Sequence, residues 1–418
     1  MFYGVTRYSL FSPGSLSWKT SRDGVFQTQD DYMQYLFSEK RLQLRADLFL
    51  TKSVPVLATM AENYHYKHFV LYSRFLPVRH KELLLEAAAT HPFIVPVEWD
   101  EVVRGTGIEE VSPLIDQDLA LMFDAKSGLQ PVVWFRLDDD DVLASDYLEC
   151  LERYRTLGNV GMAVSFGLGL TAFKAEHQLV NLREYYHPKS AQGMAFVSAF
   201  DPSRGHLAIS APGPHTGVDQ VMPTILDSRE HMFFQMRHSE QDSTLSATPY
   251  ERTAETLLKL EKLPAVRAED ISVEKWPTLF DDLACGALPG PLMPGSESVL
   301  LLEETVLTLP LDGVEGLVEV EFEFESEREL EGGFAVISYE LRGADSFDPE
   351  ILGLLRTSKN GLCRPVWSRS SRGLIRQCVL LPEGVSIKGV TLRGKKRQPA
   401  DVLIRWRSPR VVEVHSGG

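Results

Sequence analysis

The pattern of hydrophobic positions in the first third of the chain predicts strands and helices in alternation. Runs of mostly apolar residues, typical of strands covered on both faces, occur at residues 2–5, 68–73, 93–97 and 131–137. Between these runs, apolar residues recur at helical spacing in residues 31–50 and 81–89, and Pro55 is expected to close the first helical region. This alternation predicts an α/β fold in which a mostly parallel sheet is flanked by helices.

The pattern changes twice further along the chain. In residues 161–211 short apolar strands alternate with loops, which we interpret as an extension of the sheet. A Pro- and Gly-rich stretch near residue 290 then marks a domain boundary. We therefore predict an α/β domain at residues 1–290, closed by a helical segment at about 246–290, and a second domain at residues 291–418.

The second domain has the pattern of antiparallel strands. Residues 318–325 alternate strictly, with Val and Phe on one face and Glu on the other, which predicts a strand whose glutamates face solvent. Further strands are predicted at residues 334–341, 374–381, 386–392 and 402–406. An antiparallel β-sandwich fits this pattern best. Within it, Trp367 and Trp406 are interpreted as core or edge residues, with stacking on carbohydrate rings as the alternative.

Composition and charge narrow the class of protein. With 418 residues, 44% hydrophobic and 24% charged, the chain has the composition of a soluble globular protein. Neither a signal peptide nor the roughly 18 consecutive apolar residues of a membrane helix is found, so we expect a cytoplasmic protein without a transmembrane segment. The four cysteines are scattered and form no C-x-x-C pair. A net charge of −15 is the wrong sign for sequence-independent binding to nucleic acid.

Four consecutive aspartates, Asp138 to Asp141, directly follow the apolar run at residues 131–137. Ligands of open α/β sheets bind beyond the carboxyl ends of strands, so this position favours a site. Side chains alternate along an extended chain, so Asp138 and Asp140 can share one hard divalent cation with a substrate diphosphate. The alternative is a solvated loop before a helix that begins near Ser145.

Four stretches extend this interpretation when they are taken in order. They are Tyr-Gly-Val-Thr-Arg-Tyr-Ser-Leu-Phe at residues 3–11, residues 41–49, Arg-Leu-Asp-Asp-Asp-Asp at 136–141, and Gln-Met-Arg-His at 235–238. In this order the chain resembles GT-A glycosyltransferases, and more narrowly the bacterial family of putative rhamnosyltransferases, over roughly residues 1 to 245. The resemblance implies a GT-A-like, Rossmann-like fold for the first domain.

The resemblance implies a metal-dependent enzyme that moves a sugar, with rhamnose suggested by the family's name, from a nucleotide-diphosphate donor to a glycan or other hydroxyl acceptor. Asp138 and Asp140 would hold Mn²⁺ or Mg²⁺ against the donor diphosphate. His238 would complete the metal's ligands or donate to the diphosphate. The residues after His238, Ser239 to Asp242, depart from the small residue and Asn that the family carries there.

The same resemblance implies further contacts to the donor. Thr6, Arg7 and Ser9 leave the end of the first strand, where hydroxyl and guanidinium groups would contact the nucleotide. Asp138 would bind the donor together with the metal, and Asp141 would lie near the sugar. For Thr6, Arg7 and Ser9, a strand-to-loop turn with a surface arginine explains the pattern equally well.

An inverting transferase needs a base that takes the proton of the acceptor hydroxyl. Asp219 lies next to a predicted helix at residues 218–226, about where GT-A enzymes carry their base, and is the candidate. It equally fits an aspartate stabilised by the N-terminus of that helix. His215 and Asp242 are the alternatives. Residues 161–211 would form the surface that faces the acceptor.

Two other functions fit parts of the sequence. Asp138-x-Asp140-x-Val142 also fits the D-x-D-x-[TV] signature of haloacid-dehalogenase-like phosphoryl transfer, but that signature belongs on the first strand of its fold. A non-catalytic protein that binds Ca²⁺ or a glycan is the third hypothesis. The residues after Asp138 do not follow the calcium-loop pattern D-x-D-x-D-G.

Overall fold

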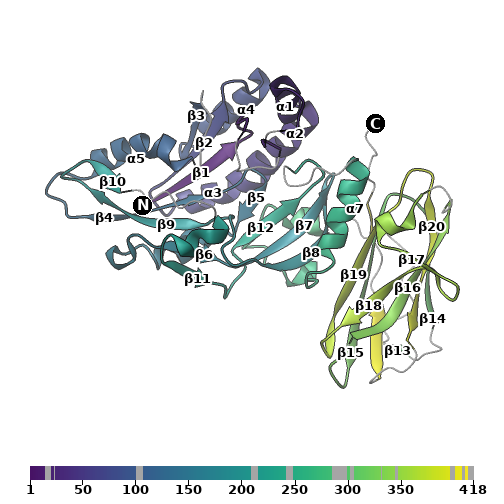
Figure 1. Cartoon of the computed structure of the whole chain (residues 1–418). Coiled ribbons are helices and arrows are strands. Elements are labelled where there is room, and N and C mark those ends of the chain that lie inside the picture. The colour runs from purple at the N-terminus through teal and green to yellow at the C-terminus, as the bar shows by residue number, and fades with distance from the viewer. Residues whose placement is uncertain are drawn as a thin grey trace.

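The computed structural model of the chain places an N-terminal α/β part beside a C-terminal part built from strands (Figure 1). It describes residues 1–14, 20–22, 24–99, 107–208, 215–241, 248–284, 299–301, 306–330, 332–343, 347–395, 401–406 and 410–412. Helix α7 (Pro249–Leu260) lies between the two parts. The stretch near residue 290, where the domain boundary is predicted, lies outside the described residues.

The largest sheet has the strand order β11-β6-β9-β4-β1-β2-β3, with β10 beside β9. Its strands are β1 (Phe2–Tyr8), β2 (Tyr66–Ser73), β3 (Ile94–Trp99), β4 (Gln130–Arg136), β6 (Ala163–Phe166), β9 (Ala195–Asp201), β10 (His206–Ala208) and β11 (Thr224–Asp227). β1 to β4 run parallel, whereas β9 runs antiparallel to both β4 and β6. The α/β fold is confirmed, and its main sheet is mixed because β9 lies between β4 and β6.

The helices of the α/β part are α1 (Gln29–Leu36), α2 (Glu39–Ala46), α3 (Val54–Ala61), α4 (Val78–Thr90), α5 (Ile108–Met122), α6 (Tyr147–Glu152) and α8 (Phe280–Ala284), with the 3₁₀ turns η2 (Leu157–Asn159) and η4 (Ala268–Asp270). Helices α3 and α4 cover one face of the largest sheet, and α5 covers the other. On one face, Leu57 and Leu84 of α3 and α4 share a core with Val70 of β2. On the other face, Ile115 of α5 packs in a core with Trp134 of β4. Alternate residues of each strand therefore serve opposite cores.

Two prolines explain where the predicted helices differ from the structure. Pro55 does not close the first helical region, because it lies in the first turn of α3, where a missing N–H is tolerated. The π-helical segment η1 (Asp47–Ser53) joins α2 to α3. The helix predicted at residues 218–226 is instead the 3₁₀ turn η3 (His215–Gln220) followed by β11. Pro223 separates them, because it cannot continue a helix.

A second, smaller sheet connects the aspartates to the C-terminal part. Its order is β5-β12-β7-β8, formed by β5 (Asp141–Leu143), β12 (Phe233–Arg237), β7 (Leu168–Ala175) and β8 (Gln178–Tyr186). β5 begins with the last aspartate of the cluster, and β8 lies at the opposite edge, where it packs near β19 of the C-terminal part. One sheet therefore spans the distance between the aspartates and the neighbouring domain.

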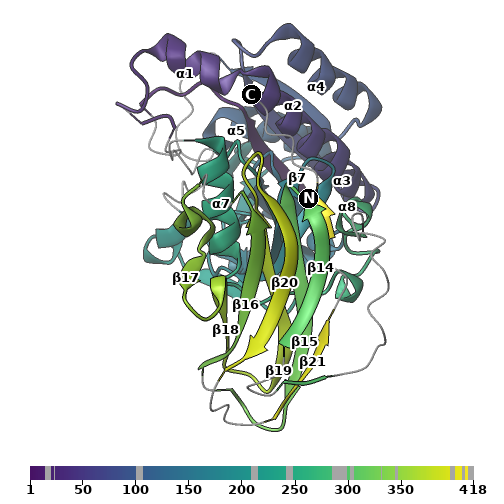
Figure 2. The ribbon, with the colours of Figure 1, turned by 90° about the vertical axis from the view of Figure 1, so that its right-hand side faces the viewer.

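The C-terminal β-domain (residues 299–412) consists of two sheets that lie face to face (Figure 2). One has β13 (Val299–Leu301), β21 (Val402–Trp406), β15 (Leu317–Ser326), β19 (Arg372–Leu380) and β22 (Arg410–Val412), and the other has β14 (Val306–Val314), β20 (Ser386–Gly394), β16 (Gly332–Arg342), β18 (Gly361–Ser368) and β17 (Leu355–Thr357). The 3₁₀ turn η6 spans Pro349–Leu352. Neighbouring strands run antiparallel, and Phe322 and Ile337 from the two sheets share one core.

Trp367 lies at the surface of this domain. Trp367 on β18 is 63% exposed, and the Lys395 ammonium lies 5.1 Å from the centre of its ring. It is therefore a surface residue and not part of the core. The side chain of Trp406 lies outside the described part of the chain.

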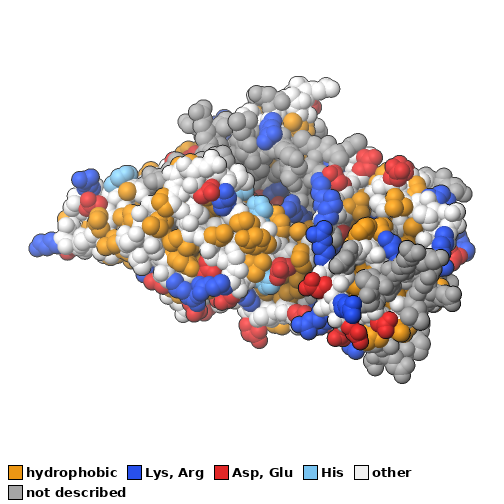
Figure 3. Space-filling view, turned by 60° about the horizontal axis from the view of Figure 1, so that its bottom comes forward, with side chains coloured by type: hydrophobic (Ala, Val, Ile, Leu, Met, Phe, Trp, Pro, Cys, Tyr) orange, Lys and Arg blue, Asp and Glu red, His pale blue; other side chains and the backbone are white. Residues whose placement is uncertain are grey.

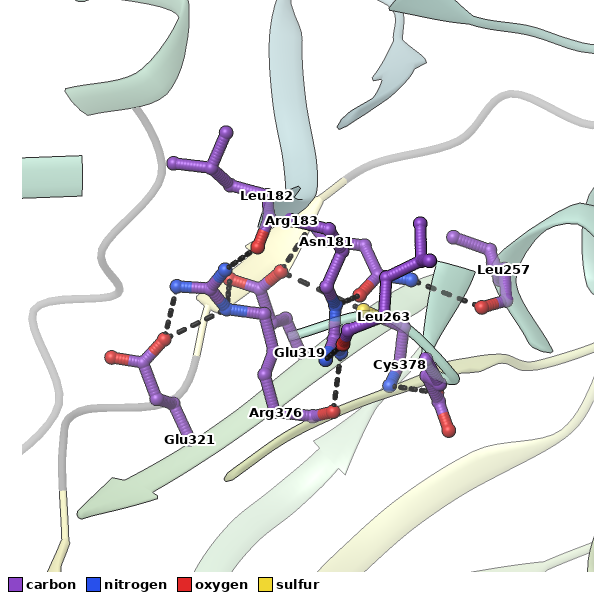
Figure 4. Close-up of polar contacts among 10 residues, drawn as sticks. Asn181, Leu182, Arg183, Leu257, Leu263, Glu319, Glu321, Arg376 and Cys378 are labelled. Carbon is purple, nitrogen blue, oxygen red and sulfur yellow. Dashed lines mark hydrogen bonds and ion pairs between the residues drawn. The ribbon is translucent and has the colours of Figure 1, made fainter. Parts of the chain in front are cut away.

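The alternating Glu strand, β15, faces the α/β part and not only solvent (Figure 4). Glu319 is 1% exposed and accepts a hydrogen bond of 2.6 Å from the Asn181 N–H of β8. Glu321 accepts a hydrogen bond of 2.7 Å from Arg376 Nε of β19. Arg183 of β8 donates to the carbonyl oxygen of Arg376 at 2.6 Å. The prediction of a solvent-facing Glu row is wrong for its first half, because these carboxylates are buried against arginines at the junction.

The second half of the same row borders an open cavity of about 640 Å³ at this junction. Glu323 and Glu325 line it together with Arg372 and Arg405, and Arg267 of the α/β part forms an ion pair with Glu323 at 3.1 Å. Both signs of charge are therefore present along the junction.

None of the helices in the described ranges has the length and apolar character needed to cross a membrane. Acidic and basic side chains are interspersed among hydrophobic and other side chains on the face shown in Figure 3.

Replacing Arg376 by Ala is expected to lower the free energy of unfolding by about 3 kcal/mol, because Glu319 and Glu321 would stay buried without their cation. Urea unfolding followed by tryptophan fluorescence measures this. Lys388→Ala is the matched control, because Lys388 pairs with Glu340 at 3.7 Å on the surface and should change stability by less than about 0.5 kcal/mol. Equal, small effects of both variants would contradict the structural role given to the buried network.

Candidate functional site

Strand β4 delivers the four aspartates to the junction of the two sheets in the α/β part. Trp134 and Phe135 are fully buried in β4, which lies between β1 and β9. Asp138 comes just after the strand, and Asp141 already belongs to β5 of the second sheet. The Asp141 N–H donates to the Asp138 carbonyl at 3.3 Å, which closes a turn. The cluster therefore lies at the carboxyl edge of the parallel strands, where ligands of such sheets bind.

A polar cavity of about 250 Å³ opens at this edge. All four aspartates line it, together with five arginines from separate parts of the chain: Arg7, Arg22, Arg41, Arg45 and Arg237. Ser9, Tyr32, Gln192, Gln235 and Gln241 also contribute to the lining. A cavity that brings guanidinium groups to acidic side chains suits a ligand with phosphate groups better than a cationic ligand.

The four aspartates differ in burial and in charge. The side chains of Asp138 and Asp140 are 36% and 14% exposed, whereas Asp139 and Asp141 are each only 2% exposed. Burial raises the pKa of Asp139 to about 7 and raises the pKa of Asp141 well above its usual value. Burial also opposes ionisation of Asp140, but the charge of Arg45 and the hydrogen bond with His238 lower its pKa. Burial therefore opposes ionisation within the cluster, and the charge of Arg45 acts in the opposite direction at Asp139 and Asp140.

Two arginines of α2 hold this part of the structure together. Arg45 contacts Asp139 through Nη1, and its Nη2 lies 3.5 Å from Asp140 Oδ2. Arg41, one helical turn earlier, donates to Ser9 Oγ at 3.2 Å. Both arginines are buried. Sequence reasoning gave Arg45 no role, although its spacing of four residues from Arg41 puts both side chains on one helix face.

His238 lies directly behind Asp140. Its Nδ1 accepts a hydrogen bond of 3.2 Å from the Glu240 N–H, so the proton of the neutral ring is on Nε2. That Nε2 lies 3.1 Å from Asp140 Oδ2 and donates to it. Burial lowers the pKa of His238, which favours the neutral ring. In this tautomer His238 orients the Asp140 carboxylate and has no nitrogen lone pair directed at the cavity.

Thr6 lies beneath the cavity and is not part of its lining. It is fully buried, and its hydroxyl donates to the Leu137 carbonyl at 2.8 Å, immediately before the aspartates. Because that hydroxyl proton is used, Thr6 Oγ1 must accept from His68 Nε2, at 2.8 Å. The Tyr66 hydroxyl then donates to His68 Nδ1 at 2.5 Å. A chain of hydrogen bonds from β2 through β1 thus fixes the end of β4.

Space for this chain depends on Gly4. A Cβ at Gly4 would lie 2.2 Å from His68 Nδ1, closer than van der Waals contact permits. Burial lowers the pKa of His68 to about 3, so its ring stays neutral at physiological pH. The Tyr-Gly-Val-Thr start of the chain therefore has a packing reason that is independent of any ligand contact.

The remaining predicted site residues fall into three groups. Arg7 and Ser9 line the cavity, and Arg7 Nη2 lies 3.9 Å from Asp138 Oδ1. Asp219, on η3, is outside the lining and forms an ion pair with Lys189 at 2.8 Å. Asp242 lies outside the described residues.

A family match covers more than half of the chain. The sequence matches the family described as putative rhamnosyl transferase over residues 1–249 of 418. The chain belongs to this family. The matched region runs from β1 to the first residue of α7, so it contains the whole cavity and leaves the β-domain outside.

Solved structures that match the chain include fragment 1–349 of S. aureus TarS in complex with UDP-GlcNAc, at 8% identity and a TM-score of 0.28, covering 62% of this chain and 65% of that one. A second structure of the same fragment has 9% identity and a TM-score of 0.24, with coverages of 63% and 65%. The chain thus spans about 65% of the length of these structures. No curated protein matches the sequence.

The pKa of His68 leads to a pH-dependent prediction. The folded protein keeps His68 neutral down to about pH 3, whereas the unfolded chain binds a proton below about pH 6.5. Stability should therefore fall as the pH drops from about 6.5. His68→Gln keeps one acceptor and one donor but does not titrate. Between about pH 7.5 and pH 5, wild type should lose about 2 kcal/mol more unfolding free energy than His68→Gln. If the unfolding free energies of wild type and His68→Gln changed in parallel with pH, the result would contradict a buried, neutral His68 ring.

Proposed function

We propose that the chain is a metal-dependent glycosyltransferase of the GT-A type. It takes a sugar, rhamnose by the family's description, from a nucleotide-diphosphate donor and transfers it to a glycan or other hydroxyl acceptor. The observation that carries the proposal is the cavity in which five arginines and four aspartates meet at the carboxyl edge of parallel strands. Membership of the family supports the same class of reaction.

The arginines explain how the donor diphosphate would be bound. Arg7 comes from β1, Arg41 and Arg45 come from α2, and Arg237 comes from β12, so the guanidinium groups approach the cavity from separate walls. Guanidinium groups bind phosphate oxygens through paired, charge-assisted hydrogen bonds. Tyr32, which also lines the cavity, continues into a stack with neighbouring aromatic rings and gives the nucleoside an apolar surface.

The aspartates fit a divalent cation that is shared with the donor. In the described part of the chain, no group of three or more His, Cys, Asp or Glu side chains is placed to hold a metal ion. Asp138 and Asp140, the two more exposed carboxylates, would hold Mn²⁺ or Mg²⁺, with diphosphate oxygens as further ligands. The cation would stabilise the charge that develops on the leaving diphosphate. His238 would orient Asp140 from behind, since its Nε2 carries the proton.

The other two functions receive less support from the geometry. β4 is the fourth strand of the chain, whereas a haloacid-dehalogenase signature belongs on the first strand. A calcium site built from protein side chains would need more carboxylates converging on one point than the described residues provide.

Calorimetric titration with UDP, dTDP and GDP, with and without Mn²⁺, tests the proposal. At least one nucleotide should bind, more tightly with Mn²⁺ than without. Asp140→Asn should remove that gain and weaken binding in Mn²⁺ by about 10-fold or more. Glu340→Gln, which changes an exposed carboxylate of the β-domain, should leave the affinity unchanged. Absence of binding by all three nucleotides, or equal binding by the Asp140 variant and wild type in Mn²⁺, would refute the proposed donor site.

A further inference from the structure

Three rings gather beside the donor cavity. Tyr185 is the last residue but one of β8, and its ring stacks on His187 with centroids 5.3 Å apart and an interplanar angle of 19°. His215, at the start of η3, lies 6.2 Å from His187, ring centre to ring centre. We call Tyr185, His187 and His215 the ring platform. Figure 3 shows His side chains beside Lys or Arg side chains near the middle of one face.

The ring platform adjoins the donor cavity, although none of its three residues is part of the cavity lining. Arg237, which lines that cavity, lies 5.9 Å from the centre of the Tyr185 ring. Gln192, also in the lining, is three residues after Lys189, whose carbonyl holds His215. A molecule seated on the platform would therefore meet whatever occupies the cavity.

The hydrogen bond to His215 determines which of its nitrogens can take a proton. His215 Nδ1 lies 2.8 Å from the Lys189 carbonyl oxygen, which can only accept, so Nδ1 carries the proton. The lone pair of the neutral ring is therefore on Nε2. None of the described residues forms a hydrogen bond with that atom. His215 thus has a fixed tautomer in which Nε2 is the proton acceptor.

The surroundings of His215 favour the neutral ring. Burial lowers its pKa, the hydrogen bond to the Lys189 carbonyl acts in the opposite direction, and Arg136 lowers it further while Asp138 raises it. Burial also lowers the pKa of the neighbouring His187. The influence of Arg136 and Asp138 also shows that His215 lies near the end of β4.

Asp219, the base candidate from the sequence, is placed less favourably. Its carboxylate pairs with the Lys189 ammonium at 2.8 Å, and its side chain is 49% exposed. The hydrogen bond from Lys189 lowers the pKa of Asp219, which makes it a weaker proton acceptor. Lys189 thus serves both residues, since its side chain engages Asp219 while its carbonyl orients His215.

We propose that the ring platform is the acceptor subsite, that it takes a neutral sugar, and that His215 Nε2 accepts the proton of the attacking hydroxyl. A sugar combines an apolar face of C–H groups, which packs on aromatic rings, with hydroxyl groups that hydrogen-bond to imidazole nitrogens. This inference rests on the proposed function, because the donor cavity supplies the activated sugar.

The step is balanced without any further reactant. The acceptor O–H bond breaks, and its proton passes to His215 Nε2. The acceptor oxygen forms a bond to the anomeric carbon of the donor sugar while the bond from that carbon to the diphosphate oxygen breaks. The diphosphate leaves with the electron pair, and the imidazolium later releases its proton to water.

The first test uses the full-length protein and does not require turnover. Histidine side chains labelled with ¹⁵N are observed by NMR while octyl rhamnoside, octyl glucoside and octyl galactoside are added in turn. His215→Asn assigns the resonance. We expect the Nδ1–H tautomer and a shift of Nε2 with at least one glycoside, whether or not a nucleotide binds. An Nε2–H tautomer, or an unmoved His215 resonance with all three glycosides, would overturn the inference.

The second test is transfer to the glycoside that shifts His215, from dTDP-rhamnose, UDP-glucose or GDP-mannose. His215→Ala should reduce kcat by about 100-fold or more, with calorimetric nucleotide affinity unchanged. Added imidazole should restore part of the lost kcat, which a purely structural role for His215 would not permit. Tyr185→Ala should raise the acceptor KM by about 5-fold. His206→Ala, at an exposed histidine of β10, is the matched control with unchanged kcat.

The outcomes separate the two proposals. Glycoside binding at His215 without any nucleotide binding would reject the donor site and leave the acceptor subsite standing. Normal nucleotide binding together with a His215→Ala variant of near wild-type kcat, or one that imidazole does not rescue, would reject His215 as the base. Loss of transfer in Asp219→Asn with retention in His215→Ala would assign the base to Asp219 instead.

Discussion

The crowding of four adjacent carboxylates at the end of β4, two of them only 2% exposed, is the constraint on which the rest of the α/β part depends. Desolvation penalises each buried charge, and the neighbouring carboxylates add repulsion. Three features reduce this repulsion: Arg45 pairs with Asp139 and Asp140, His238 donates to Asp140, and burial raises the pKa of Asp141, which disfavours its charge. The two more exposed members, Asp138 and Asp140, are the proposed cation ligands.

The same cluster is where the elements of the fold meet. Strand β4 ends there, β5 starts there, and β5 begins the second sheet, whose far edge β8 contacts the β-domain through Asn181 and Arg183. β8 also carries Tyr185 of the ring platform, next to its last residue. One strand thus joins the buried ionic junction to the proposed acceptor subsite.

The sequence predicted the parts of this arrangement that depend on local patterns. The buried run before Asp138 and the α/β alternation are visible in apolar spacing, and the four aspartates are adjacent in the chain. The partners of these aspartates are not adjacent in the chain, because Arg45 lies 94 residues from Asp139 and His238 lies 98 residues from Asp140. The prediction for the Glu row of β15 was wrong for a related reason. The alternation of apolar and Glu residues shows that the Glu319 side chain points away from the core of its own domain, but it does not show that the α/β part covers that face. For Thr6 the sequence left a donor contact and a strand-to-loop turn equally open, because it does not show that His68 lies beside Thr6.

The central claim is that the arginine and aspartate cavity holds the nucleotide and its cation. Its most direct test is a crystal structure with UDP or dTDP and Mn²⁺, using the anomalous signal of manganese. We expect one manganese peak at Asp138 and Asp140, with the diphosphate in contact with Arg45 and Arg237. A nucleotide bound elsewhere, such as in the junction cavity lined by Arg372 and Arg405, or manganese away from these aspartates would contradict it.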